Sequence, residues 1–158
     1  SHPKVIQAPF DRNKSKGSLY QGGLHVPLIL SGKSVSRINA RDQSLINSSD
    51  LFATIAEMAG VSLPSYQDSY SFNALLSAEG QGQRTFNYSE FLHSNPSMSG
   101  YALRNVNYKL LVFDNGNEEF YDLIQDPYES TNLFDEALTD GQQMALLELQ
   151  AKAREIRQ

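Results

Sequence analysis

Apolar residues first form a short continuous run and later fall at helical and strand spacings. The run is Val26–Ser31, and glycines bound it at Gly23 and Gly32. Continuous apolar runs of this length are typical of strands that a parallel sheet buries on both faces. The run therefore predicts a buried strand. The polar stretch before it, residues 1–25, contains prolines and glycines and is expected to be a loop at the surface or beside a site.

A helix is expected over residues 51–59. Ser48, Ser49 and Asp50 precede it, and these residue types commonly cap helix N-termini. Gly60 follows it, where a left-handed residue often ends a helix. Apolar residues recur at the spacing of one helix face, at Leu51, Ile55, Met58 and Ala59.

The second half of the chain changes to the period of strands. Apolar and aromatic residues gather in segments separated by turn residues, at 85–91, 101–104, 108–113 and 118–123. Strands at this close spacing predict an antiparallel meander. An amphipathic helix is expected over residues 139–157, with an apolar stripe at Leu146, Leu149, Ala153 and Ile156. One helix over one small sheet is an α+β layer pair.

Composition excludes several classes of protein. The chain has 158 residues, 40% of them hydrophobic, which is enough to bury a core. With 13 basic and 18 acidic residues its net charge is -5, which argues against a nucleic-acid binder. No apolar run approaches the roughly 20 residues of a membrane span, and no secretory leader is visible. Cysteine is absent, which excludes disulfides and thiolate zinc sites but leaves the compartment open.

Lys16 is the first candidate for chemistry. It lies between Ser15 and Gly17, ahead of the pair Gly22 and Gly23. A lysine there can present its ammonium to an anion, beside backbone N–H groups that the glycines leave accessible. The alternative is an ordinary solvated loop lysine, which the spacing alone favours.

The histidines and the acidic residues give weaker signals. His2, His25 and His93 lie far apart, so a metal cluster is not expected. His25 is expected to form a hydrogen bond at the entrance of the predicted strand. Acidic residues gather at a predicted hairpin, where a solvated turn is favoured over weak calcium binding: Asp114, Glu118, Glu119 and Asp122.

Several blocks of the sequence match motifs of one enzyme family in the same order. Lys16–Pro27 is similar to K-G-[ST]-x-[YW]-E-G-G-x-R-V-P, and Ser49–Ala56 to the helix S-x-x-D-L-x-P-T-I. Later blocks at Asp68–Phe72, Tyr101–Leu111 and Glu119–Leu133 are similar to D-G-x-S-L, A-[IL]-R-x-x-x-Y-K-L-I and E-L-Y-D-L-x-x-D-P-x-E-x-x-N-L. Together they resemble the sulfatases of the alkaline-phosphatase superfamily.

The resemblance implies an α/β fold with an added α+β part. Sulfatases have a large catalytic α/β domain and a smaller C-terminal α+β subdomain, an antiparallel sheet packed on a helix. The flexible link at residues 78–83 is the candidate boundary. Residues 1–80 would then be the end of the catalytic domain, and residues 81–158 would be the C-terminal subdomain.

The resemblance also implies a reaction, the hydrolysis of sulfate esters. The family's nucleophile is a formylglycine made from Cys or Ser in [CS]-x-[PA]-x-R. A divalent cation, usually calcium, is held by an Asp pair and an Asp-Asn pair. Neither set occurs in this chain, so no metal ligand is expected here. The chain is expected to be an inactive C-terminal fragment whose partner is the missing N-terminal catalytic portion.

One residue of this chain is assigned to the reaction by the resemblance. Lys16 would be catalytic and substrate-binding, and His25 is a weaker candidate for substrate binding. Gln21 and His25 stand where the family usually has Glu and Arg, which leaves the substrate alcohol open.

Two other functions remain open. One is a non-catalytic module that docks to a partner chain, and the other is a phosphodiester or phosphonate hydrolase of the same superfamily. A strand at 26–31 without its upstream neighbours would also expose its edges. The isolated chain is therefore expected to form a dimer or to retain an N-terminal partner fragment.

Overall fold

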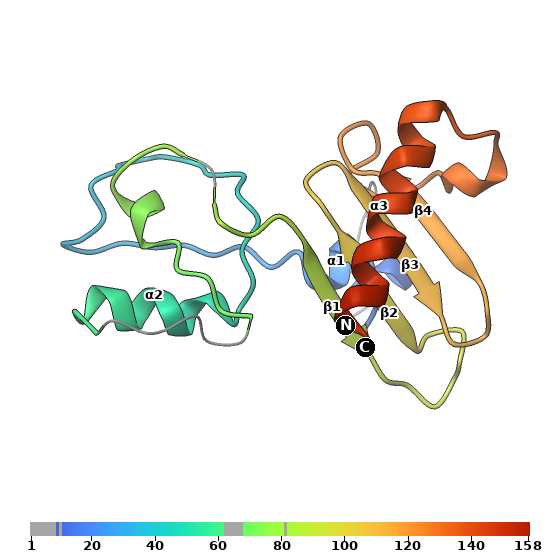
Figure 1. Ribbon diagram of the computed structural model, residues 1–158, viewed down its shortest axis with the longest axis horizontal. Coiled ribbons are helices and arrows are strands. Elements are labelled where there is room, and N and C mark those ends of the chain that lie inside the picture. Colours follow the sequence, from blue (N-terminus) through green and yellow to red (C-terminus); the bar gives the residue numbers. More distant parts are fainter. Residues whose placement is uncertain (1–8, 10, 62–67, 81) are drawn as a thin grey trace. The chain divides into compact units, whose positions relative to one another are not determined.

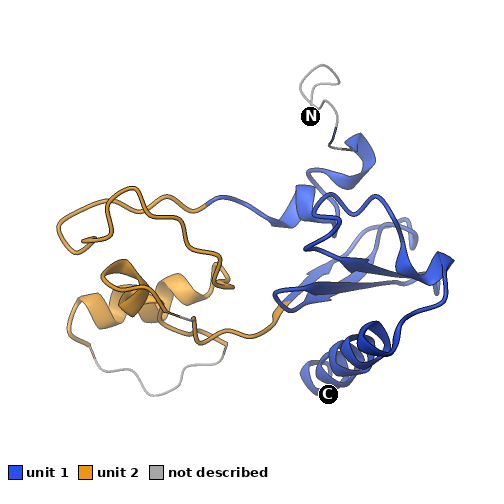
Figure 2. Ribbon diagram, turned by 90° about the horizontal axis from the view of Figure 1, so that it is seen from above, with its two compact units in different colours: residues 1–27, 88–158 blue, residues 28–87 orange. Residues whose placement is uncertain are grey.

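The computed structural model describes residues 9, 11–61, 68–80 and 82–158 (Figure 1). The chain divides into two compact units (Figure 2). Unit 1 comprises residues 1–27 and 88–158, and unit 2 comprises residues 28–87. The segment before residue 28 thus groups with the C-terminal residues. The domain boundary expected between residues 80 and 81 stays a prediction, and His2 lies outside the described residues.

A four-stranded sheet forms the centre of unit 1. Its strands are β1 (Asn87–Phe91), β2 (Gly100–Arg104), β3 (Tyr108–Phe113) and β4 (Glu118–Asp122), in the order β1-β2-β3-β4 (Figure 1). β3 pairs antiparallel with β2 and with β4. The register places Leu111 opposite Ala102 on one side and Glu119 on the other. The predicted meander is confirmed.

Helix α3 (Asp140–Ile156) covers one face of this sheet and contacts β2 and β3 (Figure 1). Thr139 and Gln142 form a capping box at its N-terminus, in which each side chain accepts a hydrogen bond from the other's backbone N–H. Leu149 and Ala153 are buried on the predicted apolar stripe. No helix in the described residues is both long and apolar enough to cross a membrane.

Unit 2 contains a buried ion pair beside a small apolar core. Helix α2 (Asp50–Met58) begins at Asp50, which is 1% exposed. Arg84 donates to its carboxylate through Nη2 at 2.6 Å and Nε at 2.8 Å, and the backbone N–H groups of Asn47 and Tyr70 donate to it as well. The buried apolar side chains of this unit come from the loop before α2 and from the short helix η2 (Asn73–Leu76) with the residue before it: Leu45, Phe72 and Leu76.

The segment 26–31 is not a strand, which corrects the sequence prediction. It has no regular secondary structure, and Val26 is 75% exposed and Ile29 89% exposed. No strand among the described residues pairs with it. An apolar run forms a buried strand only where neighbouring strands form hydrogen bonds with its backbone N–H and C=O groups. The described residues supply no such strand beside 26–31.

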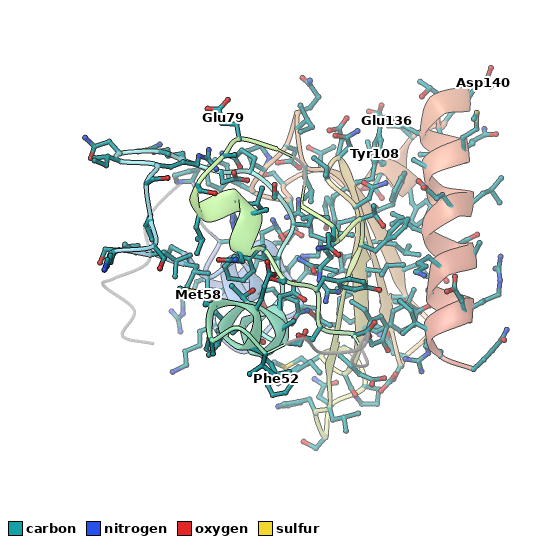
Figure 3. All side chains as sticks on the ribbon, turned by 60° about the vertical axis from the view of Figure 1, so that its left-hand side comes forward. Phe52, Met58, Glu79, Tyr108, Glu136 and Asp140 are labelled. Carbon is teal, nitrogen blue, oxygen red and sulfur yellow. The ribbon has the colours of Figure 1, made fainter. Side chains whose placement is uncertain are left out.

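Helix α2 is confirmed, but its apolar face is not buried. Phe52, Ile55 and Met58 are 51%, 63% and 48% exposed, and Figure 3 shows Phe52 and Met58 projecting from the helix. Gly60 follows with a φ of 74°, the left-handed conformation expected after a helix C-terminus. The helical spacing therefore predicted α2 correctly. Its apolar face is not covered by the described residues, so burial of that face would need further apolar surface.

Asp50→Asn should destabilise unit 2 by about 3–5 kcal/mol, because Arg84 would keep a buried charge without its partner. Burial alone raises the pKa of Asp50, but the hydrogen bonds from Arg84, Tyr70 and Asn47 outweigh it and hold that pKa below its ordinary value. The ionised carboxylate thus stabilises unit 2 above about pH 4, and this contribution is lost as the pH falls through the folded-state pKa. Amide exchange of α2, measured from about pH 2 to 6 and corrected for intrinsic rates, tests both effects.

Asp42→Asn is the matched control. Asp42 pairs with Arg37 at 2.6 Å, but its side chain is 30% exposed, so this substitution should cost less than about 1 kcal/mol. Equal protection of α2 in both variants would contradict a structural role for the buried pair.

The isolated chain should associate through the segment 26–31, which exposes apolar side chains and belongs to no strand among the described residues. Ile29→Lys should reduce association, because a charge in the segment opposes strand pairing. Ile38→Lys is the control, since Ile38 is 84% exposed but lies outside the segment. Light scattering after size-exclusion chromatography measures the mass. A wild-type monomer at high concentration would show the prediction to be wrong.

Candidate active-site loop

The segment 11–25, which contains Lys16 and His25, folds through local hydrogen bonds. The Asp11 carboxylate accepts from the backbone of Asn13 at 2.7 Å and caps the short helix η1 (Arg12–Lys14). Ser15 Oγ then donates to the first carbonyl of η1 at 2.7 Å, and Ser18 Oγ donates to the carbonyl of Ser15 at 2.6 Å. The chain therefore turns back on itself around Lys16.

A pair of glycines lets the next element lie directly on this turn. Helix α1 (Gln21–Leu24) contains Gly22 and Gly23. A Cβ atom on Gly22 would lie 2.4 Å from the carbonyl oxygen of Lys14, and one on Gly23 would lie 2.3 Å from that of Ser18. Backbone thus packs on backbone, which explains why both positions need glycine.

Leu19 anchors the segment in the core of unit 1. It is 1% exposed and packs in one cluster with side chains of β2, β3 and β4 and the residue after β4: Ala102, Leu111, Phe113, Tyr121 and Leu123. The backbone of the segment that carries Leu19 lies on the sheet face opposite α3 (Figure 2). Residues 1–25 were expected to be a loop at the surface or beside a site and not part of the core, which is wrong for Leu19.

A second anchor joins the segment to the Glu119 carboxylate on β4. Glu119 Oε2 accepts hydrogen bonds from the hydroxyls of Tyr20 and Tyr121, each at 2.7 Å. Lys14 Nζ donates to the Tyr121 hydroxyl at 3.1 Å and lies 4.7 Å from the centre of the Tyr20 ring. Burial and the neighbouring Glu119 raise the pKa of both tyrosines, so both remain protonated donors.

A third anchor is the carboxylate of Glu129, which is 1% exposed. Glu129 Oε1 accepts from Lys109 Nζ at 2.6 Å, and Oε2 accepts from the backbone N–H of Gln21 at 2.6 Å. The backbone carbonyl of Glu129 also accepts from Lys14 Nζ. Burial lowers the pKa of Lys109 to about 8, and the charge of Glu129 opposes that shift. Lys109 is therefore mostly protonated at neutral pH.

Lys16 itself points to solvent from this fixed segment. Its side chain is exposed, and no described residue forms a hydrogen bond or an ion pair with it. His25 is also exposed and follows α1, where its backbone N–H donates to the carbonyl of Gln21 at 2.8 Å. No hydrogen bond between described atoms joins the two predicted site residues. The arrangement presents on an anchored backbone an ammonium that no described carboxylate pairs with, and such a group can bind an anion.

The anchoring side chains were not among the residues predicted for the site. Their contacts join positions about 100 residues apart, so no local pattern indicates them. Two signals are present in the sequence: all of these residues except Lys14 stand at fixed letters of the family motifs, and Lys109 interrupts the apolar strand Tyr108–Phe113, where a buried lysine requires an acidic partner. The residues that anchor the loop are Lys14, Tyr20, Lys109, Glu119, Tyr121 and Glu129.

Two of the four acidic residues at the β3–β4 hairpin have structural partners. Glu119 accepts from the two tyrosines, and Asp122 Oδ1 accepts from the backbone of Ile124 at 2.9 Å and of Gln125 at 3.0 Å. In the part of the chain that the structure describes, no group of three or more His, Asp or Glu side chains is placed to hold a metal ion.

Comparison with known proteins identifies relatives for nearly the whole chain. Residues 11–157 match the family described as N-sulphoglucosamine sulphohydrolase, C-terminal. Arylsulfatase K of Mus musculus is 30% identical over 128 residues, which cover 75% of this chain and 23% of that protein. The chain thus spans about a quarter of the length of the curated relatives that it matches.

Solved sulfatase structures contain the same fold. The structure of a 2-O GAG sulfatase aligns with this chain at a TM-score of 0.64 and 23% identity. The alignment covers 80% of this chain and 28% of the sulfatase chain. A second structure was solved in complex with its substrate D-glucosamine-2-N,6-O-disulfate. It aligns at a TM-score of 0.57 and 26% identity, and the alignment covers 68% of this chain and 24% of the other chain. The predicted fold class, with its antiparallel sheet and terminal helix, is confirmed.

Gly23→Ala should destabilise unit 1 by about 1–3 kcal/mol, because the new methyl group meets backbone that side-chain rotation cannot move. Gly141→Ala is the matched control. A Cβ there meets nothing within 4 Å, and alanine favours the helix by up to about 1 kcal/mol. Chemical denaturation followed by circular dichroism compares the two. Equal denaturation midpoints in the Gly23→Ala and Gly141→Ala variants would contradict the close packing of α1 on residues 14–18.

Proposed function

Because the chain belongs to the family of N-sulphoglucosamine sulphohydrolase C-terminal domains, we propose that it is the C-terminal part of a sulfatase. The complete enzyme hydrolyses a sulfate ester, R–O–SO3⁻, to an alcohol and sulfate. The observation that carries this proposal is the family match over residues 11–157, which includes Lys16 and all of its anchoring side chains. This match favours a sulfatase over a non-catalytic docking module and over a phosphodiester or phosphonate hydrolase.

Lys16 contributes positive charge to the reaction. Its ammonium binds a sulfate oxygen and stabilises the negative charge that develops on the ester oxygen as the S–O bond breaks. Two features support this role. The side chain is exposed, and no described carboxylate compensates its charge. The segment is anchored on both sides of Lys16, so its ammonium is already positioned before each reaction cycle begins.

The covalent chemistry belongs to the missing N-terminal catalytic portion. In this family a formylglycine supplies the nucleophile and a divalent cation, usually calcium, supports it. The described residues of this chain do not fit that cation, because they place no group of three or more acidic or histidine side chains together. The sequence also lacks a [CS]-x-[PA]-x-R motif. The chain alone should therefore not hydrolyse sulfate esters.

The substrate class that we propose is a sulfated sugar. The family description names N-sulphoglucosamine, and one related structure at 26% identity was solved with a sulfated glucosamine as its substrate. His25 is the further residue of this chain that we propose to contact the substrate. It stands where the family usually has arginine, so it offers a ring nitrogen in place of a fixed positive charge.

Lys16→Ala in the complete enzyme should lower kcat by about 10²–10³-fold and change KM less, because its charge acts mainly on the transition state. Lys16→Arg should restore only part of the rate, since a planar guanidinium places its charge differently from a compact ammonium. Steady-state kinetics with an aryl sulfate and with a sulfated glucosamine measure both variants.

Lys33→Ala is the control, because Lys33 is another exposed lysine of the chain. It should leave kcat unchanged and shift stability by less than about 0.5 kcal/mol. If Lys16→Ala turns over both substrates within about twofold of wild type, the role assigned to Lys16 is wrong.

A further inference from the structure

We propose that Glu129 is a positioning residue that holds the chain on both sides of Lys16, through the Lys14 side chain before it and the Gln21 backbone after it. The inference rests on the proposed function, because it gives Glu129 a role through the lysine assigned to the reaction. Glu129 contacts Lys14, two positions before Lys16, and Gln21, five positions after it. The buried carboxylate of Glu129 makes the contact with Gln21, and its backbone carbonyl makes the contact with Lys14.

The carboxylate of Glu129 is divided between two donors. Oε1 receives Lys109 Nζ at 2.6 Å, and Oε2 receives the backbone N–H of Gln21 at 2.6 Å. Both charged side chains are 1% exposed, so water does not compete for either oxygen. Lys109 therefore fixes the carboxylate on β3, and the second oxygen fixes the first residue of α1. A hydrogen bond from a backbone N–H to a buried charge is stronger than one between neutral groups.

The backbone of Glu129 adds the contact on the other side of Lys16. Its carbonyl accepts from Lys14 Nζ, and its φ of 57° is in the left-handed region that side-chain-bearing residues seldom adopt. Glycine or asparagine would adopt this conformation more readily. The position holds a glutamate instead, whose carboxylate and carbonyl both reach the segment that carries Lys16.

The simpler explanation is that Glu129 only neutralises Lys109 in the core. The two explanations differ in the bond to Gln21. A neutralising carboxylate needs Lys109 alone, whereas a positioning carboxylate also needs the N–H of Gln21. Proline at position 21 removes that N–H, and its Cδ displaces Oε2 from position 21, while Lys109 can keep its contact with Oε1.

Gln21→Pro suits the local backbone. Gln21 is the first residue of α1, a position that favours proline, and Tyr20 before it is extended with a ψ of 165°, as a residue before proline prefers. Gln21→Ala is the matched control, because it removes the same side chain and keeps the N–H.

Amide exchange in the 158-residue chain gives the first readout. The amides of Gly23, Leu24 and His25 donate within and just after α1. They should exchange about 10- to 100-fold faster in Gln21→Pro than in Gln21→Ala, the ratio expected for one hydrogen bond to a charged group. Amides of β3 should differ by less than about twofold. Equal exchange of the α1 amides in both variants overturns the proposal, and so does an equal acceleration in β3.

Glu129→Gln tests the same bond from its other end. It keeps the shape of the side chain and removes its charge, so exchange of the α1 amides should rise. Glu90→Gln is its control, because Glu90 pairs with Arg157 at 2.7 Å in the same unit but is 46% exposed. A change of the same size in both variants overturns the proposal. If Gln21→Pro does not fold, the comparison of Glu129→Gln with Glu90→Gln decides between the two explanations.

Kinetics of the complete enzyme give the second readout. Gln21→Pro should lower kcat about tenfold more than Gln21→Ala does and change KM less, because a displaced Lys16 loses transition-state contact. If Lys16→Ala lowers kcat but the two position-21 variants agree, the positioning role is overturned and the proposed function stands. If Lys16→Ala has no effect, the proposed function falls together with the catalytic consequence drawn here.

Discussion

The buried carboxylate of Glu129 is the constraint on which unit 1 depends. At 1% exposure the carboxylate has lost its water, and it is stable as an ion only if donors replace that water. Lys109 on β3 and the N–H of Gln21 on α1 supply them. Breaking one side of a buried ion pair typically costs about 3–5 kcal/mol, so the sheet and the N-terminal segment are held together.

The sheet can meet this constraint because its two faces have different neighbours. Side chains alternate along β3, so Leu110 lies on one face and Lys109 and Leu111 on the other. Helix α3 covers the first face, and the segment around Leu19 covers the second. In the proposed sulfatase, the C-terminal subdomain thus supports a lysine from far earlier in the sequence. Gln21 and Glu129, which make the central contact, are 108 positions apart.

Local patterns were enough to predict the four strands of the sheet and helices α2 and α3, because their causes are local, but not η1 and α1 in the segment expected to be a loop. The capping residue Thr139 predicted the start of α3, and the alternation along 108–113 predicted β3, each to within about one residue of the observed bounds. The burial of 26–31 was predicted wrongly, because it depends on neighbouring strands that a pattern does not contain. The carboxylate of Glu129 was not predicted either, because its partners are distant. Lys16 was a candidate from its glycine-rich surroundings, and the role that the family resemblance assigns to it stays a proposal.

The most direct test of this account is ¹⁵N relaxation of the backbone in the 158-residue chain at neutral pH. If the anchors hold the segment as described, residues 14–21 should have order parameters near those of β3, at about 0.85. The Lys16 side chain should remain mobile on that rigid backbone. Order parameters below about 0.6 in residues 14–21, beside an ordered β3, would contradict the claim that the C-terminal sheet fixes the Lys16 backbone.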